Sequence, residues 1–288
     1  MRMIALPMTV NQHDLLDPAL ARFLGAHALA SFTIGLGFVA AGSALLWWMA
    51  HRLIVPRSDS RLPPSVFLLS RLALGFGFVA AAGYGFAEVA EALDAGTSLR
   101  TFDQTLTDAL REGTPIEVVR MFAMLTHLGD PGTLIVPGLL VGLLLVLRGR
   151  RWLALGWMLA LGGNAVLNPL LKARFARMRP LHEHELVTAH GFSFPSGHSS
   201  GSVVVYGMLA YVLVRILPAR WHLPVAVFAA ALAFTVGCSR IFLQVHYASD
   251  VAAGFASGFA WLAVCVTSIE LLRHYHRVRG GAVRTPPY

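Results

Sequence analysis

Residues 152–171 read WLALGWMLALGGNAVLNPLL, and residues 172–198 continue directly with KARFARMRPLHEHELVTAHGFSFPSGH. The first stretch carries no charge and has the length of about 20 residues that a helix needs to cross a bilayer. The second stretch is basic and polar, and it ends where another apolar run begins. The alternation predicts a membrane-spanning helix that delivers a basic loop to one membrane face.

The composition of the whole chain is also typical of a membrane protein. Of the 288 residues, 56% are hydrophobic and 13% are charged, and the mean hydropathy is +0.63. Soluble domains carry about 25% charged residues. The net charge of +8 comes from basic residues in short segments beside apolar runs, which is typical of membrane-flanking charge rather than of nucleic-acid binding. We therefore predict an all-α, polytopic transmembrane helical bundle.

The apolar runs divide the chain into seven predicted spans. They lie at residues 28–50, 66–90, 132–147, 152–171, 199–217, 223–238 and 250–272. Residues 1–26 do not have the pattern of a secretory signal, because polar residues interrupt a short apolar stretch. A short surface helix is expected near residues 15–24. In the last span, Gly254 and Gly258 are four residues apart and predict a close helix contact.

Residues 91–131 differ from the spans because they carry several acidic side chains. Apolar residues recur there at helical spacing, which predicts an amphipathic helix; they are Leu99, Phe102, Leu106 and Leu110. Thr114 to Glu117 has the pattern of a capping box with proline at the first helical position, for a second helix that ends at Leu128. We expect both helices to lie along the membrane surface over the bundle.

Chain crossings predict which polar segments share a membrane face. Two spans separate residues 172–198 from residues 239–250, and an even number of crossings returns the chain to the same side. The opposite face holds the arginine-bearing loops 51–65, 148–151 and 218–222. Because such loops mark the cytoplasmic side, we expect the 172–198 and 239–250 segments on the non-cytoplasmic face of a bacterial plasma (inner) membrane.

The two polar segments contain groups suited to a phosphate. Lys172 and Arg179 are seven residues apart, so in a helix continuing to Pro180 they would point the same way. A guanidinium can hold two phosphate oxygens and an ammonium supplies a point charge. Several fixed cations are what the charge on a transferred phosphoryl group requires.

Pro195-Ser196-Gly197-His198 lies where the fifth predicted span begins. Gly197 allows the backbone to approach an anion, and unpaired N–H groups at a helix start favour anions. The Ser196 hydroxyl can donate as well. His198, at the rim, has a side chain suited to proton transfer near neutral pH.

Ser239-Arg240 is followed by His246 and Asp250. Asp250 is four residues after His246, so in a helix the carboxylate can accept from one imidazole nitrogen and leave the other as a nucleophile. Arg240 can supply a third cation. The chain shows no His, Cys or carboxylate cluster with metal-ligand spacing. This pattern agrees with a site that uses no metal and no cofactor.

Together these segments resemble the type 2 phosphatidic acid phosphatase family, whose core is shared with vanadium haloperoxidases. The family signature K-x6-R-P, P-S-G-H and S-R-x5-H-x3-D is matched at every position, and the resemblance covers about residues 95–272. It implies that His246 attacks phosphorus to form phosphohistidine, oriented by Asp250, and that His198 protonates the leaving oxygen. The groups it implies for the phosphoryl oxygens are Lys172, Arg179, Ser196, Gly197 and Arg240.

The resemblance also implies an organisation. Residues 1–94 would form an N-terminal segment with two spans, residues 95–272 a phosphatase core with five spans and interfacial helices, and residues 273–288 a basic tail. Membrane members usually have six spans, so the span at residues 28–50 would be the additional one.

The implied activity is metal-independent hydrolysis of a membrane lipid phosphate at the bilayer interface. Candidate substrates are undecaprenyl diphosphate, phosphatidic acid, phosphatidylglycerol phosphate and lipid A phosphates. Two alternatives remain open, namely a phosphotransferase that passes the phosphoryl group to another lipid and a non-catalytic lipid-binding or transport protein. A haloperoxidase is disfavoured by the seven spans. The sequence does not determine the oligomeric state.

Overall fold

The computed structural model describes residues 16–54, 64–96, 98–180 and 186–282. The predictions for the extreme N-terminus, for the break at Pro63 and for the end of the tail lie outside these residues. The described part contains α1(Pro18–Ala26), α2(Ala28–Ile54), α3(Pro64–Ala95), α4(Ser98–Gly113), α5(Ile116–Leu125), η2(Thr126–Gly129), α6(Pro131–Leu147), α7(Arg151–Phe175), α8(Gly197–Val214), η3(Ala219–Trp221), α9(His222–Phe242) and α10(Ala248–Ala282).

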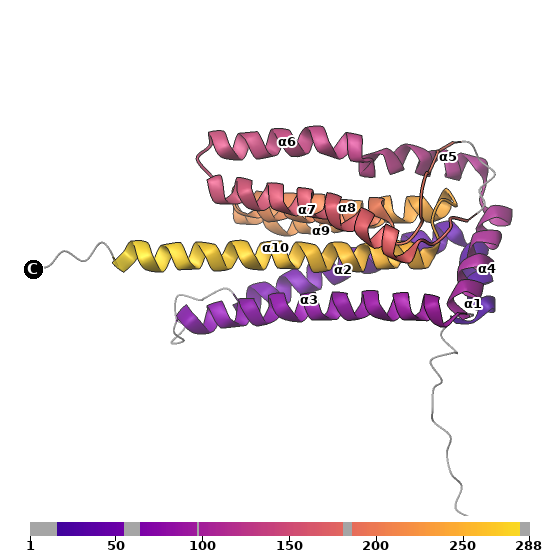
Figure 1. Cartoon of the computed structure of the whole chain (residues 1–288), viewed down its shortest axis with the longest axis horizontal. Coiled ribbons are helices and arrows are strands. Elements are labelled where there is room, and N and C mark those ends of the chain that lie inside the picture. The colour runs from indigo at the N-terminus through magenta and orange to yellow at the C-terminus, as the bar shows by residue number, and fades with distance from the viewer. Residues whose placement is uncertain (1–15, 55–63, 97, 181–185, 283–288) are drawn as a thin grey trace, which may run out of the picture.

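The long helices form a bundle, while α1 and α4 lie across one of its ends (Figure 1). Seven stretches of the described chain are long and apolar enough to cross a membrane, so the predicted number of spans is confirmed. Large apolar side chains remain exposed on the bundle, for example Phe38, Phe76 and Phe228. Exposed apolar surface of this kind suits lipid, because lipid tails are as apolar as the side chains.

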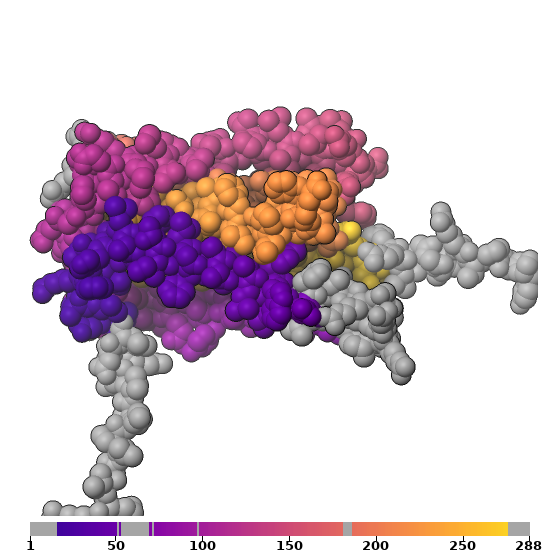
Figure 2. All heavy atoms as spheres, turned by 180° about the vertical axis from the view of Figure 1, so that it is seen from behind, coloured from indigo at the N-terminus to yellow at the C-terminus, as the bar shows by residue number. Residues whose placement is uncertain are grey.

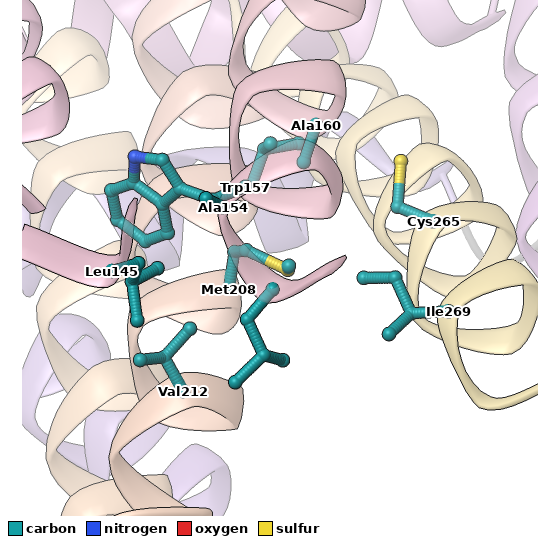
Figure 3. Close-up of a cluster of buried hydrophobic side chains, with 10 residues drawn as sticks. Leu145, Ala154, Trp157, Ala160, Met208, Val212, Cys265 and Ile269 are labelled. Atoms are coloured by element: carbon teal, nitrogen blue, oxygen red, sulfur yellow. The ribbon is translucent and has the colours of Figure 1, made fainter. Parts of the chain in front are cut away.

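A buried apolar cluster holds the centre of the bundle together (Figure 3). Four helices contribute, with Leu145 on α6, Trp157 on α7, Met208 on α8 and Ile269 on α10. The indole N–H of Trp157 donates to the backbone oxygen of Gly138 at 2.7 Å, which satisfies its polar group and ties α7 to α6.

The two N-terminal spans pack on the outside of this bundle. α2 contacts α9, and α3 runs along α10; Figure 2 shows α2, in indigo to violet, beside the orange α9. Phe32 on α2 lies edge-on to Phe122 of α5 and Phe242 of α9. The division at residue 94 into an N-terminal segment and a core stays a prediction.

The predicted glycine contact in the last span forms between α10 and α8. A Cβ at position 254 would lie 2.6 Å from the Ser196 carbonyl oxygen, and one at position 258 would lie 2.9 Å from that of Ser200. Neither position has room for a side chain. The two glycines therefore allow α10 to lie against the first turns of α8.

The prediction for residues 114–128 was wrong in two respects. The capping box does not form, because α5 begins after Pro115 without a side-chain cap, and the Thr114 hydroxyl is buried without a partner among the described residues. The helix ends at Leu125 rather than Leu128, and a tighter turn, Thr126–Gly129, joins it to α6. Residues 116–147 together meet the length and apolarity of one candidate span, and the placement of α5 along the membrane surface stays a prediction.

The seventh span and the tail also differ from the prediction. α10 does not end at Leu272 but continues to Ala282, so the beginning of the predicted tail is helical. In contrast, the short helix expected near residues 15–24 is present as α1, which starts at an Asp17 cap and packs against α4.

Candidate active site

The structure brings the predicted polar segments together at the end of the bundle where α1 and α4 lie. Ser196 caps α8: its side chain accepts from the backbone N–H of Ser199 at 3.4 Å, and its own N–H donates to the Asp250 carbonyl oxygen at 2.9 Å. The first turns of α8 and α10 are thereby held against each other. Gly197, the first residue of α8, packs against Asn168 of α7.

Three cationic side chains lie around this point. Lys172 donates to the Phe192 carbonyl oxygen at 2.6 Å. Arg179 donates to the carbonyl oxygen of Val245 at 2.7 Å and lies 3.0 Å from the imidazole of His246. Arg240 is 2% exposed and donates to the Thr126 hydroxyl at 2.7 Å.

Arg240 also has a donor without a partner. Its Nε–H is buried and has no hydrogen-bond acceptor among the described residues. A buried charged donor that remains unpaired is costly, and buried polar groups otherwise find partners. An anion bound beside Arg240 would satisfy this donor, which makes the cluster a candidate phosphate site.

The contacts of His246 determine which ring nitrogen is free. Arg179 Nη1 lies 3.0 Å from Nε2 of His246, and a guanidinium can only donate, so Nε2 is the unprotonated nitrogen. The proton is then on Nδ1, which faces Asp250 Oδ2 at 3.4 Å. Burial, together with the neighbouring Arg179, Arg240 and Lys172, holds the pKa of His246 well below its usual value. The lone pair on Nε2 of His246 therefore lies among the cations, where it accepts from Arg179.

His198 has a carboxylate partner that the sequence analysis did not identify. Its Nε2 lies 2.7 Å from Asp130 Oδ1, and the other oxygen of Asp130 lies 2.6 Å from His127 Nδ1. Asp130 is at the N-cap position of α6 but makes no capping hydrogen bond, which leaves its carboxylate for the two histidines. The only local signal was an aspartate before Pro131 at a helix start.

Two local predictions about these residues were wrong. Lys172 and Arg179 do not share a helix, because α7 ends at Phe175 and Ala176 adopts a left-handed conformation with φ +46°. The loop then turns Arg179 back to His246, so both cations reach the site by different routes. His246 likewise precedes α10 rather than lying in it, and only Asp250 is in the first helical turn.

The fold and this cluster together define an integral membrane protein with a basic, histidine-containing cluster of side chains at one end of a helical bundle. Residues 151–273 match the PAP2 superfamily, and the chain belongs to that superfamily. The matched region begins at residue 151, whereas the resemblance in the sequence analysis was expected to begin near residue 95. The matched region includes every residue of the K-x6-R-P, P-S-G-H and S-R-x5-H-x3-D motifs.

Similar proteins include a curated relative and a solved structure. The chain is 37% identical over 136 residues to phosphatidylglycerophosphatase B of Bacillus subtilis, and the alignment covers 46% of this chain and 66% of that protein. It thus spans just under two thirds of the length of this relative. The crystal structure of a transmembrane PAP2-type phosphatidylglycerolphosphate phosphatase from Bacillus subtilis is also similar, with a TM-score of 0.63, 29% identity and coverage of 67% of this chain and 96% of that one.

Proposed function

We propose that this protein is a lipid phosphate phosphatase that works through a phosphohistidine intermediate. The observation that carries the proposal is the arrangement of His246, whose unprotonated Nε2 lies 3.0 Å from Arg179, with the charges of Arg240 and Lys172 also acting on the ring. A neutral nucleophile surrounded by fixed cations is suited to attack on a phosphorus whose oxygens carry negative charge.

The proposed reaction has two steps. Nε2 of His246 attacks phosphorus and forms a P–N bond, while the bond to the ester oxygen breaks and that oxygen takes a proton from His198. A water then attacks phosphorus and gives a proton to His198, and the P–N bond breaks to release inorganic phosphate. Asp250 holds Nδ1–H throughout, and Asp130 holds His198 in both steps. Ser196 and Gly197, at the start of α8, would contact the phosphoryl oxygens together with the three cations.

We propose a phosphatidylglycerophosphate-type monoester as the first substrate to examine, because the relative and the solved structure both carry names that refer to it. The site lies at one end of the spans, so a phosphorylated headgroup could enter while its chains remain in the bilayer. Undecaprenyl diphosphate, phosphatidic acid and lipid A phosphates present the same terminal phosphate. Phosphate release from a panel of these lipids tests the proposal, and a labelled acceptor lipid would reveal a phosphotransferase.

We also propose that the site faces the non-cytoplasmic side of a bacterial plasma membrane. The opposite end of the bundle carries arginines close to the span ends, at residues 148, 150, 151 and 220, and short basic segments of this kind are retained in the cytoplasm. Thiol labelling of single cysteines placed in the 148–151 turn and near residue 190 in intact cells tests this orientation.

Activity is expected to persist in excess EDTA. The charge that a metal would neutralise is met here by Lys172, Arg179 and Arg240, and no group of three or more His, Cys, Asp or Glu in the described chain is placed to hold a metal ion. Phosphate release from a lipid phosphate should therefore be unchanged by the chelator. Activity that disappears with EDTA and returns with magnesium would contradict a metal-free site.

The dependence of kcat/KM on pH is expected to be bell-shaped. His246 must be neutral to attack, and because its pKa is lowered by burial and nearby cations, the acidic limb should lie below about 6.5, the usual value of histidine. His198 must be protonated to act as the acid, so activity should fall again as the pH rises through the pKa of His198. A flat profile between about pH 4 and 9, or an acidic limb above the usual value of histidine, would contradict this assignment.

A further inference from the structure

A second arginine of the 172–180 segment contacts the other side of Asp250. Arg177 donates through Nη1 to Asp250 Oδ1 at 2.7 Å and through Nη2 to Asp103 Oδ2 at 2.8 Å. Both carboxylates are fully buried, and the guanidinium side chain is only 15% exposed. One guanidinium therefore joins α4 to the first turn of α10, on the side of Asp250 that does not face His246.

The contacts around this guanidinium hold it from three directions. Asp103 also accepts from the backbone N–H of Ser249 at 3.1 Å and from the Ser249 hydroxyl. The ring of Tyr247 lies 4.2 Å from the guanidinium carbon, and the tyrosine hydroxyl contacts Gln104 of α4 at 3.3 Å. Tyr247 lies in the short segment that leads into α10, and Ser249 lies in the first turn of that helix.

The network bears on the orientation of Asp250. Its Oδ2 receives the Tyr247 N–H at 2.9 Å and His246 Nδ1 at 3.4 Å, while Oδ1 receives Arg177. Two buried carboxylates share this single guanidinium, so without it one of them would have to take up a proton or rotate toward water. In either case the carboxylate would no longer fix the imidazole with Nε2 toward the substrate.

We propose that Arg177 and Asp103 are positioning residues for the reaction, with Arg177 holding the Asp250 carboxylate in place behind His246 and Asp103 holding Arg177. The inference rests on the proposed function, in which His246 is the nucleophile. The inference gives α4 a role in catalysis, through Asp103. This residue lies on the buried face of α4, with Leu99, Thr107 and Leu110. It also lies outside residues 151–273, which match the superfamily.

A neighbouring cavity makes this inference accessible to chemical rescue. A cavity of about 720 Å³ lies against Arg177 and Tyr247, and its wall includes Arg100, Gln104 and Phe175. Removal of the Arg177 side chain would leave a site open to this space. A free guanidinium ion could then enter and contact the two carboxylates.

The test compares kcat and KM of Arg177→Ala with those of wild type, with and without guanidinium at concentrations too low to unfold the protein. We expect kcat to fall about 100-fold, the size of effect that misplaced catalytic groups produce, with KM nearly unchanged and with part of the lost kcat restored by guanidinium. Arg174→Ala is the matched control, because Arg174 is exposed and lies over the Phe175 ring; it should behave as wild type in both conditions.

Asp103→Asn is the second variant and serves if Arg177→Ala does not fold. It keeps the size of the side chain but removes the charge, and we expect a fall in kcat of about tenfold without a change in KM. A folded Arg177→Ala or Asp103→Asn protein with wild-type kcat, a loss confined to KM, or a loss in folded Arg177→Ala that guanidinium does not restore would overturn the inference. If His246→Ala also remains active, the proposed function itself fails.

Discussion

Replacement of His246 by alanine should lower turnover by on the order of 10⁴-fold or more, because a covalent mechanism has no route around its nucleophile. The residue is 2% exposed and makes side-chain contacts with Arg179 and Asp250. Loss of the imidazole leaves the three cations in place, so binding of a lipid phosphate should persist. The measurement is phosphate release by purified protein, together with a binding assay for the same lipid.

A matched control separates loss of the nucleophile from loss of the fold. His222 lies at the start of α9, at the opposite end of the bundle, where its ring contacts the Leu217 carbonyl oxygen. His222→Ala should retain wild-type turnover. If His246→Ala elutes and melts as wild type and still turns over lipid phosphate, His246 is not the nucleophile.

The second large effect is expected for His198→Ala and should depend on the leaving group. A lipid alkoxide is a poor leaving group and needs a proton, so turnover of a lipid phosphate should fall by about 10²- to 10⁴-fold, the usual contribution of general acid catalysis. A nitrophenyl phosphate releases a stable phenolate, so transfer of its phosphoryl group to His246 depends much less on a proton from His198. The measurement is the ratio of kcat/KM for the two substrates in wild type and variant, because kcat/KM reports the phosphorylation step and not the later hydrolysis of the phosphohistidine, in which His198 also takes part.

Asp130→Asn provides an internal comparison for this test. Asp130 contacts His198 at 2.7 Å and not His246, so its removal should impair lipid phosphate turnover more than nitrophenyl phosphate turnover. Equal losses of kcat/KM on both substrates in His198→Ala would show that His198 does not protonate the leaving group. In contrast, loss of Arg177 acts on the nucleophile and should affect both substrates.

The sequence was sufficient to predict the spans because the bilayer imposes a length and a polarity on each of them. The number of spans agrees with the structure, and the Gly254 contact followed from the absence of a side chain. Local pattern was less reliable where tertiary packing competes with it. Thr114 has the sequence of a cap, but its hydroxyl is buried without a partner among the described residues. Residues 116–125 pack against α9 through Phe122, which stacks on Phe242.

At the site, spacing indicated the right segments but the wrong local geometry. Arg179 approaches His246 because α7 ends early at Ala176 and the chain turns back, and helical spacing could not anticipate this turn. Asp103, Asp130 and Arg177 were missed because each is identified only by its partner across the fold. Asp103 lies on the buried face of an amphipathic helix, where an acidic residue was a signal that counting apolar positions did not use.

The most direct test of the account is to trap the covalent intermediate. Purified protein mixed with a lipid labelled at its phosphate should be quenched into alkali, which preserves a phosphohistidine, and digested for mass spectrometry. We expect a single acid-labile phosphate on His246 in wild type and none in His246→Ala. Label on another residue, or rapid turnover of the lipid with no labelled protein at any time, would contradict it.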